Sequence, residues 1–74
     1  MQRVNRVKRE AMGETIRKLR KELRYTQKDF GALLKVSGMT VSNCELGIRF
    51  PSGDMLISLA KIAKANKVKI KFIE

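Results

Sequence analysis

The stretch QKDFGALLKVSGMTVSNCELGIRFP, residues 27–51, decides the fold of this chain. Thr26, just ahead of it, can accept a backbone N–H with its hydroxyl and predicts the start of a helix over about 27–34. Ser37 can cap a second helix over about 38–46 in the same way. The stretch therefore predicts two short helices joined by a tight turn.

Apolar side chains define an inner face on both predicted helices. The residues expected to point inward are Phe30, Leu33, Leu34, Val41 and Cys44. Gly31 is expected where a side chain would block the close approach of the following helix. The outer face of the second helix carries polar and small residues, so this helix is shaped to enter a groove.

The flanking segments complete a predicted all-α fold of four to five helices. Met12, Ile16, Leu19 and Leu23 recur at helical spacing, and Ser52 is expected to cap a last helix that ends near 65–66. Alternating residues over 67–72 predict a short strand, which needs a partner strand. We expect this partner to be the same strand of a second copy, paired through Val68, Ile70 and Phe72.

Three segments follow from these patterns. Residues 1–12 are read as a basic arm or leader, 13–66 as the helical domain and 67–74 as the dimerisation strand. Arg3, Arg6, Lys8 and Arg9 either follow a nucleic acid or remain solvated. The lysines of the predicted strand, Lys67, Lys69 and Lys71, more often serve solubility than binding.

Composition excludes several classes of function. The chain has 74 residues, one cysteine and no histidine, so neither an internal disulfide nor a usual zinc site is expected. We expect no cofactor and no enzyme activity, because the ordinary pairs of nucleophile and base are missing. Cys44 is read as a buried apolar residue. No apolar run approaches the length of a membrane span, so we expect a cytoplasmic protein.

The charge balance points to a nucleic acid partner. There are 17 Lys and Arg against 7 Asp and Glu, a net charge of +10. A polar helix on such a basic chain favours double-stranded DNA, read through the major groove. A basic RNA-binding module is the alternative of another class. It explains the second helix less well, since RNA-binding proteins usually display stacking aromatic residues.

Residues from Ile16 to about Phe72 resemble the lambda-repressor and Cro-like helix-turn-helix family, also called the Xre family. The similarity lies in Gln27, Gly31, the run from Thr40 to Asn43, and the sequence after it. That sequence contains Glu45, Gly47 and the pair Pro51-Ser52. The resemblance implies a transcriptional repressor.

The resemblance also implies roles for individual residues. Gln27 would contact a backbone phosphate, and Arg20 would form an ion pair with Glu45. The implied groove-facing residues are Ser37, Gly38, Met39, Thr40, Ser42 and Asn43. Arg49 lies just after the second helix, where the same DNA strand should pass, and we expect it to contact phosphate.

Two features depart from the family pattern. Lys35 stands where the turn often carries glycine, so either the backbone accepts a left-handed lysine or the turn differs. Gly38 and Met39 replace the amide or basic side chains that family members often carry. Base readout would then rest on Asn43, Thr40 and Ser42.

The predicted strand narrows the resemblance to antitoxins of the HipB type, whose helix four continues into a pairing strand. This implies a homodimer on an inverted-repeat operator, a HipA-like kinase toxin as partner, and association with the nucleoid. A stand-alone or phage Cro-like regulator is the alternative, because such proteins also dimerise through a terminal strand.

Overall fold

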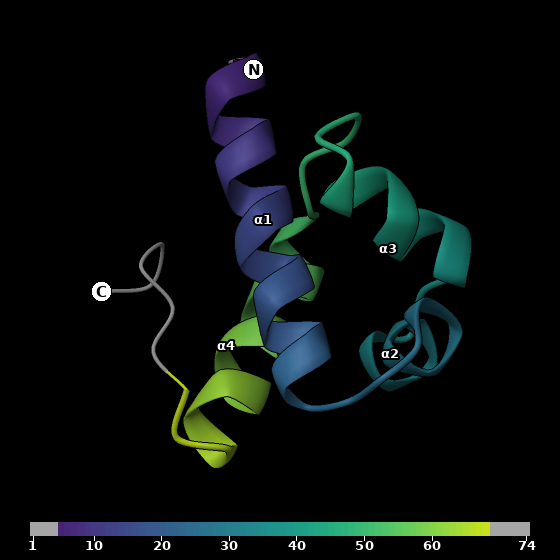
Figure 1. Ribbon diagram of the computed structural model, residues 1–74, viewed down its shortest axis with the longest axis vertical. Helices are drawn as coiled ribbons and strands as arrows, with labels where there is room; N and C mark the ends of the chain where they lie inside the picture. The colour runs from purple at the N-terminus through teal and green to yellow at the C-terminus, as the bar shows by residue number, and fades with distance from the viewer. Residues whose placement is uncertain (1–4, 69–74) are drawn as a thin grey trace.

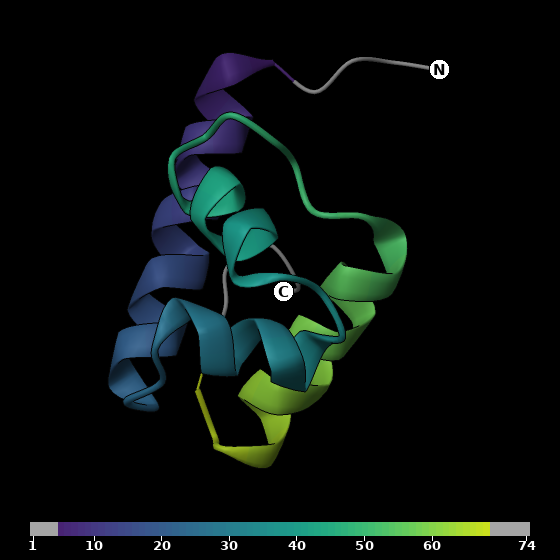
Figure 2. The same cartoon turned by 90° about the vertical axis from the view of Figure 1, so that its right-hand side faces the viewer.

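Four α-helices make up the regular structure of the computed structural model, which describes residues 5–68. They are α1 (Arg6–Glu22), α2 (Gln27–Leu34), α3 (Gly38–Glu45) and α4 (Gly53–Ala65). In Figure 1, α2 and α3 lie to the right of α1, and the turned view of Figure 2 places α4 on the opposite side of the molecule from α1. Figure 2 shows α2 crossing between α1 and α4, with α3 packed over it. The all-α prediction is confirmed for this range.

Side-chain caps set the start of each short helix. The hydroxyls of Thr26, Ser37 and Ser52 accept the backbone N–H three residues on, at 3.0, 3.1 and 3.2 Å. These contacts satisfy donors that a helix start leaves without an intrahelical partner. The three predicted caps are therefore confirmed, and the starts of α2, α3 and α4 follow from the sequence.

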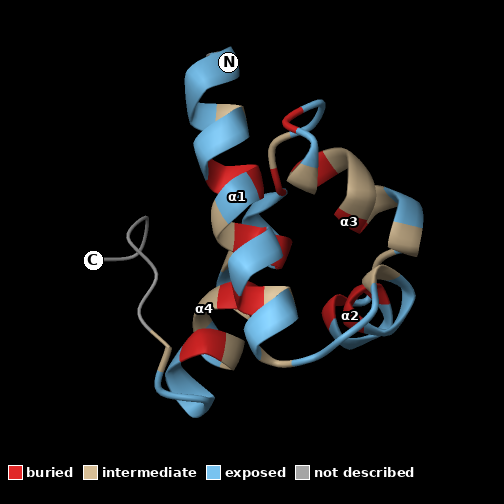
Figure 3. Cartoon of the chain, viewed as in Figure 1, coloured by how far each residue is buried: buried red, intermediate tan, exposed pale blue. Residues whose placement is uncertain are grey.

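The core forms where the four helices face one another, as the buried bands in Figure 3 show. Its buried apolar residues are Met12, Ile16, Leu19, Phe30, Leu34, Val41, Cys44, Met55, Leu59 and Ala63. The expectation for Leu33 is wrong, because this side chain is 45% exposed. The buried face of α2 is centred between Phe30 and Gly31, which leaves Leu33 at its edge.

The first helix begins earlier than its apolar stripe indicated. Asn5 caps it by accepting the N–H of Lys8 at 2.9 Å, so residues 6–12, read as part of an arm, form the first turns of α1. These turns were missed because burial starts only at Met12. The expectation for residues 1–4 falls outside the described range.

The segment after α4 departs from the predicted strand. Lys67 adopts a left-handed backbone with φ 57°, and the N–H of Val68 donates to Ala63 O at 2.8 Å. These contacts close the end of a helix rather than open a strand. Val68, expected at a dimer interface, packs against the core of its own chain. The remaining strand residues, including Ile70 and Phe72, lie outside the described residues, and the described range contains no strand.

All four helices end in the same backbone turn. In each, the residue that follows a left-handed position donates its N–H five residues back, a pattern that satisfies carbonyls at the helix end. The left-handed residues of these turns are Arg24, Lys35, Gly47 and Lys67. Lys35 therefore accepts the left-handed conformation, with φ 61° and ψ 39°. Cations at these positions also face the negative ends of the helix dipoles.

Candidate nucleic-acid interface

The inner face of α3 is buried against the core. Val41 and Cys44 have no exposed surface, and burial raises the pKa of the Cys44 thiol. Gly13 of α1 makes this close packing possible. A Cβ at Gly13 would lie 2.6 Å from the carbonyl oxygen of Glu45 and would also meet the carbonyl oxygen of Cys44. The backbones of α1 and α3 thus touch, which holds α3 rigidly.

The outer face of α3 carries the six residues predicted to face a groove. Met39 stands out from this face, with 72% of its surface exposed. Ser37 is exposed, while Gly38, Thr40, Ser42 and Asn43 are half-buried. The Ser37 hydroxyl caps α3 and lies 3.0 Å from the Thr40 hydroxyl. This face therefore presents one flexible apolar side chain among short polar groups.

Gly38 brings the start of α3 close to the start of α2. A Cβ at Gly38 would lie 3.1 Å from Lys28 Cα, tighter than ordinary packing. The residue that departs from the family pattern thus has a packing role. Lys28 is exposed beside it, so a cation stands next to the start of α3. Lys28 was not singled out from the sequence, where it reads as an ordinary surface residue of a helix.

Arg20 and Glu45 form the ion pair that the resemblance implied. Arg20 Nε donates to Glu45 Oε2 at 2.6 Å and Arg20 Nη2 to Glu45 Oε1 at 3.1 Å, a bidentate arrangement. The side chains are only 12% and 5% exposed. Hydrogen bonding to Glu45 raises the pKa of Arg20 further above its usual value. Arg20 also donates to the carbonyl oxygen of Tyr25 at 2.9 Å.

Gln27 joins this network from the first position of α2. Its Nε2 donates to Glu45 Oε1 at 3.2 Å, so the side chain is oriented by the carboxylate. The amide has a second N–H. Gln27 itself is half-buried and lies beside Ser42 of α3. Gln27 is therefore placed to offer a donor from a fixed position.

Arg49 lies in the loop after α3 and is exposed. Its backbone N–H donates to Asn43 O at 3.3 Å, which ties the loop to the end of α3. Gly47 in the same loop has φ 76°, and its carbonyl accepts from Arg9 Nε at 2.9 Å. The early turns of α1 thus support the loop that carries Arg49.

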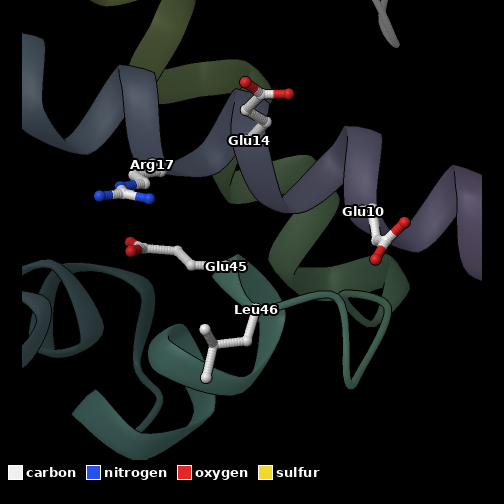
Figure 4. Close-up of a pocket in the computed structure, with 5 residues that line it drawn as sticks. All are labelled: Glu10, Glu14, Arg17, Glu45 and Leu46. Atoms are coloured by element: carbon white, nitrogen blue, oxygen red, sulfur yellow. The ribbon is translucent and has the colours of Figure 1, made fainter.

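Two shallow depressions lie on the surface between α1 and the exposed side of α3. The first, about 290 Å³, is the acidic depression, lined by Glu10, Glu14, Arg17, Glu45 and Leu46. In Figure 4 the Arg17 side chain points from α1 toward Glu45, while Glu14 points away. The second, about 260 Å³, is the basic depression, lined by Arg17, Arg20, Lys21, Gln27, Ser42, Glu45 and Leu46.

Arg17 and Lys21 were not among the residues predicted for the site. Two cations four residues apart share one face of a helix, and from the sequence alone such a face looks like ordinary solvated surface. Only the packing of α1 against α3 brings them beside Gln27 and Ser42.

Within residues 5–68, no helix is both long and apolar enough to span a bilayer.

The chain belongs to the helix-turn-helix family, whose family model matches residues 16–70. It is also similar to the HTH-type transcriptional regulator DicA of Escherichia coli (strain K12), with 38% identity over 61 residues. The matched region covers 82% of this chain and 45% of that relative. The chain thus spans less than half the length of the relative.

Proposed function

We propose that this chain is a sequence-specific DNA-binding transcriptional regulator that inserts α3 into the major groove. The observation that carries the proposal is the contrast between the two faces of α3. Val41 and Cys44 are fully buried, whereas Met39 on the opposite side is 72% exposed. A helix held this firmly by one face, with its other face open, fits a groove reader. The similarity to a transcriptional regulator supports the same role.

Charge supports binding to the DNA backbone. The chain carries a net charge of +10, and Lys28 and Arg49 are exposed near the two ends of α3. If a dimer neutralises about six phosphates, the logarithm of its affinity should fall with the logarithm of salt concentration at a slope of about −5. Gln27, whose amide is oriented by Glu45, would supply a neutral phosphate contact.

The proposed assembly is a homodimer on an inverted repeat. Two copies of α3 would then enter major grooves about 34 Å apart. The alternating sequence after Lys67 supports pairing between copies, although Val68 itself packs on its own core. Sedimentation of the free protein and of its DNA complex tests this assembly. A complex of one protomer per duplex would overturn it.

A competition assay tests the choice of nucleic acid. A labelled mixed-sequence DNA duplex is bound at one fixed salt concentration and challenged with unlabelled duplex DNA, folded RNA or single-stranded RNA. The proposal expects duplex DNA to compete best. If either RNA competes better than the duplex, the protein is an RNA-binding module and the major-groove proposal fails.

The finer role we propose is that of an antitoxin and autorepressor in a HipBA-like system. The run from Thr40 to Asn43 and the alternating C-terminal sequence support it through their resemblance to HipB-type antitoxins. A stand-alone regulator is the competing role, and the similarity to the transcriptional regulator DicA is compatible with both. Purification of the tagged protein from its native host separates them. A co-purifying HipA-like kinase supports the antitoxin, and its absence supports the stand-alone regulator.

A further inference from the structure

We propose that Arg17 and Lys21 of α1, together with Gln27 and Ser42, form a seat for a phosphodiester group of the DNA backbone. Helix α1 would then be a third contact element beside α2 and α3. This inference rests on the proposed function and extends it, because these two cations belong to neither helix of the helix-turn-helix unit.

Arg17 and Lys21 lie together on the side of α1 that borders α3. Arg17 and Lys21 are four residues apart, so they occupy one face of α1. Both side chains are exposed, and both line the basic depression of about 260 Å³. Gln27 and Ser42 line the same depression from α2 and α3. A DNA strand bordering the groove that receives α3 would pass this point, since Ser42 belongs to α3 itself.

The charges that line the basic depression are unbalanced. Glu45 is already bound by Arg20 and by Gln27. Within residues 5–68, neither Arg17 nor Lys21 has an ion-pair partner. The depression is therefore lined by three cations and one carboxylate, and that carboxylate is paired with only one of the three cations. An anion entering it would neutralise charges that the fold leaves uncompensated.

Two uncharged hydrogen-bond donors, Gln27 and Ser42, line the same depression. One N–H of the Gln27 side-chain amide is held by Glu45, which leaves the second for a ligand. The Ser42 hydroxyl adds a further donor at the same depression. Uncharged donors combined with Arg and Lys are the groups that usually hold DNA phosphates.

The proposed seat ends where the acidic depression begins, on the N-terminal side of Arg17. Glu10 and Glu14 lie on α1 before Arg17 and would repel a phosphate. Figure 4 shows both carboxylates on the same helix as Arg17, with Glu10 toward its N-terminal end. The phosphate path therefore runs from Arg17 through Lys21 to Gln27 and does not continue along the first turns of α1.

The test compares two double variants that remove the same charge. Arg17→Gln/Lys21→Gln alters the proposed seat, whereas Lys61→Gln/Lys64→Gln removes two exposed lysines from α4. Affinity for a mixed-sequence duplex is measured across a salt series for both and for the wild-type protein. Direct contact by two cations predicts that the first variant loses about 1.8 from the salt slope for each bound protomer. The α4 variant should retain the wild-type slope.

Further outcomes are decisive as well. Equal changes in the two double variants would mean that only overall charge matters, and this would overturn the seat. An Arg17→Lys variant should keep the wild-type slope, because it keeps the charge. Matching melting temperatures for all variants show that any loss is not caused by unfolding. If the wild-type protein does not bind duplex DNA, the proposed function fails and the seat fails with it. A wild-type protein that binds while the seat variant is unaffected overturns the seat alone.

Discussion

Gln27 Nε2 donates to Glu45 Oε1 at 3.2 Å, so the first residue of α2 is joined to the last residue of α3. The covalent turn connects the other ends of these helices. Because Arg20 of α1 holds the same carboxylate, three helices meet at one side chain. The angle between α2 and α3, which a groove-binding unit must keep fixed, is therefore set at both ends.

Replacement of Glu45 by glutamine should be strongly destabilising. The change keeps the size of the side chain but leaves Arg20, whose side chain is 12% exposed, without its anionic partner. We expect a loss of about 2–3 kcal/mol in the free energy of unfolding, measured by urea denaturation. Glu14→Gln on the exposed side of α1 is the control and should change stability by less than about 0.5 kcal/mol. Equal effects would contradict the structural role of the pair.

Gly13→Ala should destabilise the protein even though alanine is the better helix former. The added Cβ would lie 2.6 Å from Glu45 O, and a backbone carbonyl cannot move away as a flexible side chain can. We expect a loss of about 1–3 kcal/mol. Gly53→Ala is the matched control, because nothing lies within 4 Å of its added Cβ. A Gly13→Ala protein that melts at or above the wild-type temperature would show that α1 and α3 do not approach so closely.

Lys35→Gly should stabilise the protein. Lysine at φ 61° is in a left-handed conformation that glycine adopts without steric cost, so a gain of about 0.5–1 kcal/mol is expected. The same substitution at Lys28, inside α2, should cost about 0.5–1 kcal/mol. Thermal melts of the two variants should thus shift in opposite directions. A parallel shift would mean that Lys35 is not left-handed in solution.

Asn43→Ala and Arg49→Ala should affect DNA binding in different ways. Asn43 lies on α3, so its loss should relax the preference among duplex sequences. Arg49 is exposed in the following loop, and its loss should weaken all duplexes about equally and reduce the salt slope by about 1. Binding to a panel of duplexes at several salt concentrations measures both effects. The reverse pattern would exchange the two roles.

Much of the fold could be predicted from local chemistry. Thr26, Ser37 and Ser52 were identified as caps because each is a short hydroxyl side chain ahead of an apolar pattern, and each cap is present. The core stripe of α1 was found from the helical spacing of its apolar residues, and Met12, Ile16 and Leu19 are buried. These features depend on neighbours in sequence, which is why the residues alone revealed them.

The errors arose where tertiary contacts decide. The exposure of Leu33 follows from the packing of Gly31 against Val36 and Ser37, which turns the buried face of α2 away from it. The first turns of α1 lack a buried face, so no apolar pattern revealed them. Arg17 and Lys21 became part of the candidate site only because α1 lies against α3.

The proposed binding mode places the outer face of α3 in the major groove of duplex DNA. Titration of the isotope-labelled protein with a duplex, followed by amide NMR shifts, tests it most directly. We expect the largest shifts at Gln27 and over residues 37–43, with little change at Lys61 and Lys64 on α4. Shifts centred on α4, or an α3 that remains unperturbed by saturating DNA, would contradict it.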